Sequence, residues 1–60
     1  MNIGDNFRAT TDSGGSHCYK YLGIDENVNS CNIKLKDLQY GSIMWVNDIW
    51  FNLRTISILK

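Results

Sequence analysis

Residues 31–36 place the strongest constraint on the fold of this chain. The apolar side chains of Cys31, Ile33 and Leu35 alternate there with polar side chains. Because successive side chains of a β-strand point to opposite faces, this alternation predicts a strand with one buried face and one solvated face. Helical periodicity is hard to find elsewhere in the chain, so β-structure is expected to form the framework.

Four further runs have strand character and are separated by turn-forming clusters. They are rich in Val, Ile, Tyr, Trp and Thr and cover residues 6–11, 17–25, 43–46 and 54–59. We expect turns at the Gly-rich cluster 12–16 and within residues 25–29 and 37–42. Residues 49–53 fit one short helical turn, of α or 3₁₀ type, preceded by residues that cap helices well.

The inward face of residues 17–25 is ambiguous. Strict alternation puts Tyr19 and Tyr21 on one face, and the opposite face then carries Cys18, Lys20, Leu22 and Ile24. A bulge at Gly23 would instead bring Tyr21 and Ile24 to the same side. Both alternatives remain open at this level.

The aromatic side chains exceed what a core of this size is expected to hide. We expect Phe7, one tyrosine of residues 17–25, one residue of the run 43–46 and Phe51 to fill the core. Met44 and Trp45 are strand neighbours and cannot both point inward. Trp50 and Phe51 are neighbours on one helical turn and likewise cannot both point inward. At least two large apolar side chains should therefore be partly exposed.

The order of these elements resembles that of a known class of small barrels. The stretches Ile24-Asp25, Ile33-Lys34-Leu35-Lys36-Asp37, Tyr40-Gly41 and Trp45-Val46 are similar to the middle of Tudor and KOW-type domains, and Ile3-Gly4-Asp5-Asn6-Phe7 resembles their entry into the first strand. The resemblance covers residues 3–58. It implies an all-β fold: a small five-stranded SH3-like barrel, one domain over residues 1–60, with one short helical turn before the last strand.

The chain also departs from these families. The six basic and six acidic residues balance, and only Lys34 and Lys36 share a strand face. The basic stripe of dedicated nucleic-acid binders is therefore not expected here. The proline usual near the last strand of peptide-binding SH3 domains is missing as well.

The two cysteines are expected to be reduced thiols. If the second and third strands pair across a turn near Asn27, Cys31 lies opposite Ile24 and Cys18 opposite Asp37, which separates the sulfur atoms. A disulfide is the alternative, since it would help a domain this small.

Catalytic and metal-binding constellations are missing from the sequence. His17 and Cys18 are strand neighbours that point to opposite faces, and no second histidine can act as a base. Two Cys and one His fall one ligand short of a common structural zinc set. Gly14-Gly15 lacks the spacing and the lysine of a phosphate-binding loop. We predict no enzymatic activity, no metal and no cofactor.

Location and source can also be inferred from the sequence. Residues 1–5 lack the features of a signal peptide, and no apolar run approaches the roughly 20 residues that span a bilayer. We therefore expect a cytoplasmic protein that does not bind a membrane. Short length and frequent Asn and Ile suggest a phage or mobile-element protein.

The aromatic side chains suggest a function, because Trp and Tyr are enriched at interface hot spots. The candidate surface covers residues 40–51 with neighbours from the second strand, and its binding residues are Tyr19, Tyr21, Tyr40, Met44, Trp45 and Trp50. We predict a small accessory or regulatory module that binds a larger host protein. A homodimer is an alternative, formed by pairing the apolar fourth strand or the last strand with its copy.

Two other functions are weighed against this prediction. A nucleic-acid-binding barrel would stack bases on its exposed aromatic rings, with Lys34, Lys36 and Arg54 near the phosphates. A Tudor-like aromatic cage would hold a methylated Lys or Arg by cation–π attraction. Because the charges balance, we favour the protein-interaction hypothesis over the nucleic-acid hypothesis.

Overall fold

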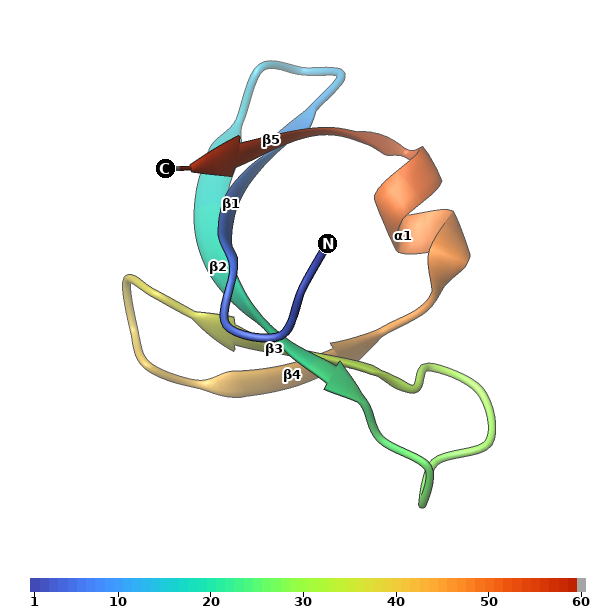
Figure 1. The fold of residues 1–60 in the computed structure, drawn as a ribbon. Helices are drawn as coiled ribbons and strands as arrows, with labels where there is room; N and C mark the ends of the chain where they lie inside the picture. Colours follow the sequence, from blue (N-terminus) through green and yellow to red (C-terminus); the bar gives the residue numbers. More distant parts are fainter. Residues whose placement is uncertain (60) are drawn as a thin grey trace.

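The computed structural model describes residues 1–59, which form five strands and one short helix. In chain order these are β1 (Asn6–Thr11), β2 (Ser16–Ile24), β3 (Ile33–Asp37), β4 (Ile43–Val46), α1 (Asp48–Asn52) and β5 (Arg54–Leu59). All neighbouring strands pair antiparallel in one sheet of order β4-β3-β2-β1-β5. The sheet curls, and α1 lies across the gap between its two edge strands (Figure 1). The predicted all-β class, with five strands and a helical turn before the last one, is confirmed.

The strand boundaries follow the predicted runs closely. β1, β4 and β5 have the predicted bounds, and β2 begins and ends one residue early, at Ser16 and Ile24. β3 begins at Ile33 rather than at Cys31, because the Asp25 amide donates to the Asn32 carbonyl at 2.7 Å and closes the loop at that point. Cys31 is therefore a half-buried loop residue, which corrects the expectation that it lies in the core.

The helix α1 begins where its capping residue dictates. Asn47 has extended backbone angles, and its side-chain oxygen accepts a hydrogen bond from the Trp50 amide at 3.1 Å. At the other end the Leu53 amide donates to the Ile49 carbonyl at 3.0 Å. These bonds define a single α-helical turn over Asp48–Asn52 and fix the direction of Trp50 and Phe51.

A β-bulge resolves the ambiguity in β2. The pairing of β2 with β3 shifts between Tyr21 and Gly23, and Gly23 has a positive φ of 94°. Tyr21 then lies opposite Leu35, and Ile24 lies opposite the buried Ile33. The bulge predicted as one alternative is confirmed, and the tyrosine face of β2 is the inward face.

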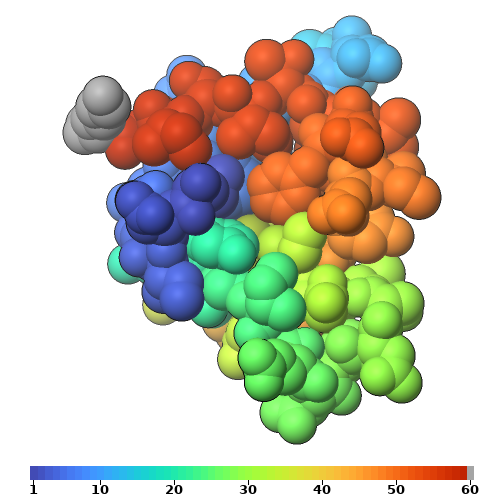
Figure 2. Space-filling model, turned by 45° about the vertical axis from the view of Figure 1, so that its right-hand side comes forward, coloured from blue at the N-terminus to red at the C-terminus, as the bar shows by residue number. Residues whose placement is uncertain are grey.

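The N-terminal residues pack beside the bulge. The Gly4 amide donates to the Tyr21 carbonyl at 2.8 Å, and the Tyr21 amide donates to the Asp5 carbonyl at 2.9 Å. A Cβ atom at Gly23 would lie 3.0 Å from Ile3 Cδ1, so the small residue makes room for this contact. In Figure 2 the N-terminal segment (dark blue) lies against the end of β2 (teal).

The core is small and extends onto the helix. Five apolar side chains are buried: Phe7, Ala9, Ile33, Leu35 and Val46. Six half-buried side chains pack against them: Tyr19, Tyr21, Met44, Trp50, Phe51 and Ile56. The expectation that only one β2 tyrosine and only one ring of α1 reach the core is wrong. Both rings of α1 reach it because the helix lies over the opening of the sheet rather than against a flat face.

The cysteines lie at opposite ends of β3. Cys18 accepts a hydrogen bond on its carbonyl from the Leu38 amide at 3.1 Å, just beyond the last residue of β3, and Cys31 precedes the first. Both are free and half-buried. Within residues 1–59, no helix has the length and hydropathy to cross a membrane.

Two leucines offer a matched test of this core. Leu35 is fully buried and Leu53 is 61% exposed. Leu35→Ala should lower the free energy of unfolding by about 2–5 kcal/mol, because it removes buried methyl groups and leaves a cavity. Leu53→Ala should change it by less than about 0.5 kcal/mol. Urea denaturation followed by Trp fluorescence measures both, and equal losses would contradict this assignment of the core.

Candidate functional site

Four aromatic rings and an arginine form a continuous row on one side of the molecule. The His17 ring lies 6.0 Å from that of Tyr40 and 5.6 Å from that of Tyr19, measured between centroids. Tyr19 meets Trp50 edge to face at 5.4 Å. The Arg54 guanidinium lies 4.3 Å from the centre of the Trp50 ring. We call these five residues the aromatic row.

Each member of the row comes from a segment that fixes its position. Tyr19 lies on the inward face of β2, opposite Asp37, and its ring packs against Phe7 at 5.7 Å. The turn that carries Tyr40 is held by Asp37 Oδ1, which accepts from the amides of Gln39 at 2.8 Å and Tyr40 at 3.1 Å. The row therefore joins the β3–β4 turn, β2, α1 and the start of β5.

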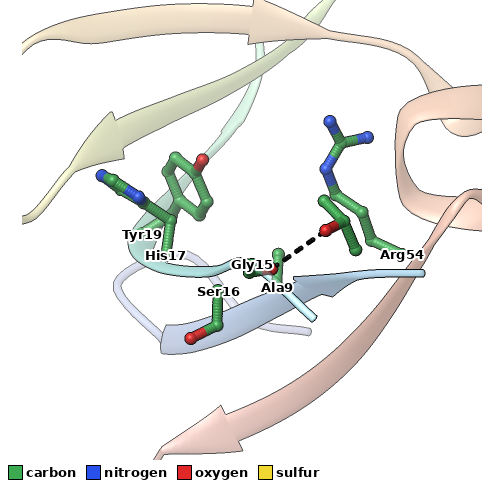
Figure 3. Close-up of a pocket in the computed structure, with 7 residues that line it drawn as sticks. Ala9, Gly15, Ser16, His17, Tyr19 and Arg54 are labelled. Atoms are coloured by element: carbon green, nitrogen blue, oxygen red, sulfur yellow. Dashed lines mark hydrogen bonds between the residues drawn. The ribbon is translucent and has the colours of Figure 1, made fainter. Parts of the chain in front are cut away.

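An open pocket of about 200 Å³ adjoins the row. Its lining comes from β1, the β1–β2 loop, β2 and β5: Ala9, Thr11, Gly15, Ser16, His17, Tyr19 and Arg54. Thr11 Oγ1 donates to the Gly15 carbonyl at 3.2 Å and holds the loop closed. In Figure 3 the Tyr19 hydroxyl and the Arg54 guanidinium stand on the same side of β1, above the loop.

Charged groups surround Tyr19. His17 Nε2 lies 3.2 Å from Asp37 Oδ2, within ion-pair distance when the imidazole is protonated. Burial raises the pKa of the Tyr19 phenol, the Asp37 carboxylate raises it further, and the Arg54 guanidinium lowers it. Like any tyrosine hydroxyl below about pH 10, this group is protonated at neutral pH and can donate a hydrogen bond.

A second surface lies on the outer face of the sheet. Trp45 is 44% exposed there and pairs with Lys34 across β3 and β4, while Lys36 pairs with both Ile43 and Lys20. Arg8 lies on the same outward side of the neighbouring β1, because its strand neighbours Phe7 and Ala9 are buried. Four cations thus share one face: Arg8, Lys20, Lys34 and Lys36. Lys34 and Lys36 share one face of β3 as expected, and the register of the sheet adds Lys20 from β2 and Arg8 from β1 to the same side.

Trp45 is held in place on this outer face. Its indole Nε1 donates to Asp25 Oδ2 at 2.9 Å, and Lys34 Nζ lies 5.7 Å from its ring centre. This hydrogen bond is the main cause of a lowered pKa of the exposed Asp25 carboxyl, with a further contribution from the Asn27 amide. The loop between β2 and β3 is thereby tied to β4.

The predicted site residues divide into three groups. Tyr19, Tyr40 and Trp50 come together in the aromatic row. Tyr21 and Met44 pack against the core, and Trp45 lies on the outer face. Residues 40–51 therefore do not form one continuous surface as expected.

Sequence reasoning missed two members of the aromatic row, His17 and Arg54. The sequence pattern suggested only a catalytic base or a metal ligand for His17, and only a phosphate contact for Arg54. The alternation of His17 and Tyr19 in one strand was a usable signal that they share a face. Within residues 1–59 no group of three or more His, Cys, Asp or Glu side chains is arranged to hold a metal ion.

The electrostatics of the row can be tested through Tyr19. Its phenol should titrate above the ordinary value of about 10. Asp37→Asn should lower this pKa and Arg54→Gln should raise it, because each substitution removes one of the charges that act on the phenol. Tyr19 ¹³Cζ shifts followed by NMR between pH 8 and 12 measure both variants. Shifts in the opposite directions would refute the placement of these charges.

The raised pKa also has a consequence for stability. Since the unfolded chain loses the Tyr19 proton at lower pH than the folded chain, the contribution of Tyr19 to stability is complete below about pH 10. It is lost as the pH rises through the pKa of the folded state.

Comparison with known proteins finds no match for this chain. The chain matches no family model, and neither a curated protein nor a solved structure is similar to it. Functional inference therefore starts from the aromatic row, the pocket beside it and the cationic outer face.

Proposed function

We propose that this chain is a non-enzymatic protein-interaction module that binds a segment of a larger protein along the aromatic row. The observation that carries the proposal is the unbroken series of ring contacts from Tyr40 to Arg54 beside an open pocket. Aromatic and arginine side chains of this kind dominate the energetics of interfaces.

The row combines rigidity with access. Trp50 is fixed by the cap of α1 and by Phe51, whose ring centre lies 5.0 Å away. Tyr40, at the other end, is 74% exposed. A surface whose side chains are already positioned loses little conformational entropy when a partner binds. This arrangement favours binding of an extended segment to a surface that is already folded, rather than binding coupled to folding of this chain.

The size of the molecule limits the contact it can make. Its accessible surface is 4218 Å², and an interface of standard size takes about 800 Å² from each partner. Such an interface would occupy about a fifth of this chain. A single contact of this size around the row is enough for an accessory or regulatory role.

The test removes one ring that the core does not need. Tyr40→Ala should reduce recovery of the bound protein at least tenfold in a pull-down from nuclease-treated lysate, because truncation of a hot-spot ring costs about 2 kcal/mol or more, which is about thirtyfold. Trp45→Ala, on the outer face, is the matched control and should leave recovery unchanged. Quantitative mass spectrometry reads both. Full recovery with Tyr40→Ala, or loss only with Trp45→Ala, would refute the proposal.

A second candidate function is binding of single-stranded nucleic acid on the outer face. The observation that favours it is the strand register, which places Lys34 opposite the exposed Trp45 and puts Lys36, Lys20 and Arg8 on the same face of β3, β2 and β1. Stacking of bases on an aromatic ring beside a cationic track is how sequence-tolerant single-strand binders work.

Salt dependence tests this second candidate. If four cations contact phosphates, the logarithm of the association constant should fall with that of the salt concentration with a slope of about −3. Lys36→Gln should make the slope shallower by about 0.7, and Arg54→Gln, away from this face, should not. Fluorescence anisotropy with a labelled oligonucleotide measures these slopes. No binding at low salt would exclude the candidate.

A further inference from the structure

Arg54 is fixed in place but keeps most of its hydrogen-bonding capacity. Its guanidinium stacks over Trp50 at 4.3 Å, and Nη1 donates to the Trp50 carbonyl at 3.0 Å. A guanidinium has five N–H donors in a planar fork that matches a carboxylate. Within residues 1–59 no carboxylate lies within ion-pair distance of it, and the Asp37 carboxylate lies 3.2 Å from His17 Nε2.

A second donor lines the same pocket. The Tyr19 hydroxyl makes no hydrogen bond to another group of residues 1–59, and it stands on the same side of β1 as the Arg54 guanidinium (Figure 3). The loop hydroxyl of Thr11 is already engaged with the Gly15 carbonyl and with Ser13. The pocket therefore offers two donors that make no ion pair or side-chain hydrogen bond: the Tyr19 hydroxyl and the remaining N–H groups of the cationic Arg54 guanidinium.

We propose that this pocket binds a carboxylate group through Arg54 and Tyr19. The proposal rests on the proposed function and deepens it: the carboxylate is that of an acidic residue, or of the C-terminus, in the partner segment that lies along the aromatic row.

Charge and size favour a monoanion. Arg54 contributes one fixed positive charge, and the nearby Asp37 carboxylate opposes a second negative charge on the ligand. The open pocket of about 200 Å³ has room for a carboxylate with its adjoining methylene groups. A planar carboxylate can accept two parallel N–H bonds from the guanidinium, which a single lysine could not supply.

Acetate is the first probe. Titration of the full chain with sodium acetate, at constant ionic strength kept with sodium chloride, should give saturable NMR shifts at Arg54 Nε–H and the Gly15 and Ser16 amides. One charge-assisted contact predicts a dissociation constant on the order of 10 mM. Inorganic phosphate at neutral pH should bind more weakly. Shifts that never saturate, or tighter binding of phosphate, would overturn the carboxylate assignment.

Two variants and one control locate the binding. Arg54→Lys keeps the charge and loses the planar fork, so it should weaken acetate binding about tenfold. Arg54→Gln should abolish it. Arg8→Gln removes a cation from the outer face and should leave the acetate titration unchanged. The amide spectrum of each variant reports whether it is folded, and acetate binding by a folded Arg54→Gln variant would refute the site.

Recovery of the partner in the pull-down distinguishes failure of this proposal from failure of the function on which it rests. Loss of the partner with Tyr40→Ala but full recovery with Arg54→Lys and Arg54→Gln would leave the aromatic row as an interface and refute the assignment of a partner carboxylate to the pocket. Unchanged recovery with all three variants would refute the proposed function itself. Acetate binding without any effect on the partner would assign the pocket to a free small carboxylate instead.

Discussion

The packing of α1 into the opening of the curled sheet is the interaction on which the rest of the structure depends. β4 and β5 are the two edges of the sheet, and α1 lies across the gap between them. Phe51 reaches the buried Phe7 at 5.8 Å, and Trp50 touches Tyr19 at 5.4 Å. One helical turn thus completes a core of only five buried side chains. The same contacts position Tyr19 and Trp50 of the aromatic row, so the stability of the fold and the geometry of this part of the site have a common origin.

Much of the fold could be predicted because it depends on local chemistry. Alternation identified the strands, and clusters rich in Gly, Asp and Asn identified the turns, so β1, β4 and β5 have the predicted bounds. The bulge at Gly23 was one of two alternatives, and only the pairing with β3 decided between them. The packing of both Trp50 and Phe51 against the core could not be predicted, because it depends on where α1 lies relative to two strands distant in sequence.

The candidate site was less accessible to sequence reasoning. Aromatic content indicated a binding surface, and three of the six predicted residues belong to the row. Their contact through His17 depends on the position of the β3–β4 turn over β2. Likewise, Lys20 and Lys36 are far apart in sequence and become cross-strand neighbours only through the register. Cross-strand pairing thus gives a chain with balanced charge one cationic face.

Photo-crosslinking from position 40 is the most direct test of the central claim, that the aromatic row is the binding surface. A photoreactive phenylalanine derivative would replace Tyr40 in one variant and Trp45 in another, and both would be irradiated in lysate of the cells that make the protein. The account predicts one discrete protein adduct from position 40, resistant to nuclease, and none from position 45. An adduct from position 45 alone would place the binding surface on the outer face of the sheet and contradict the account.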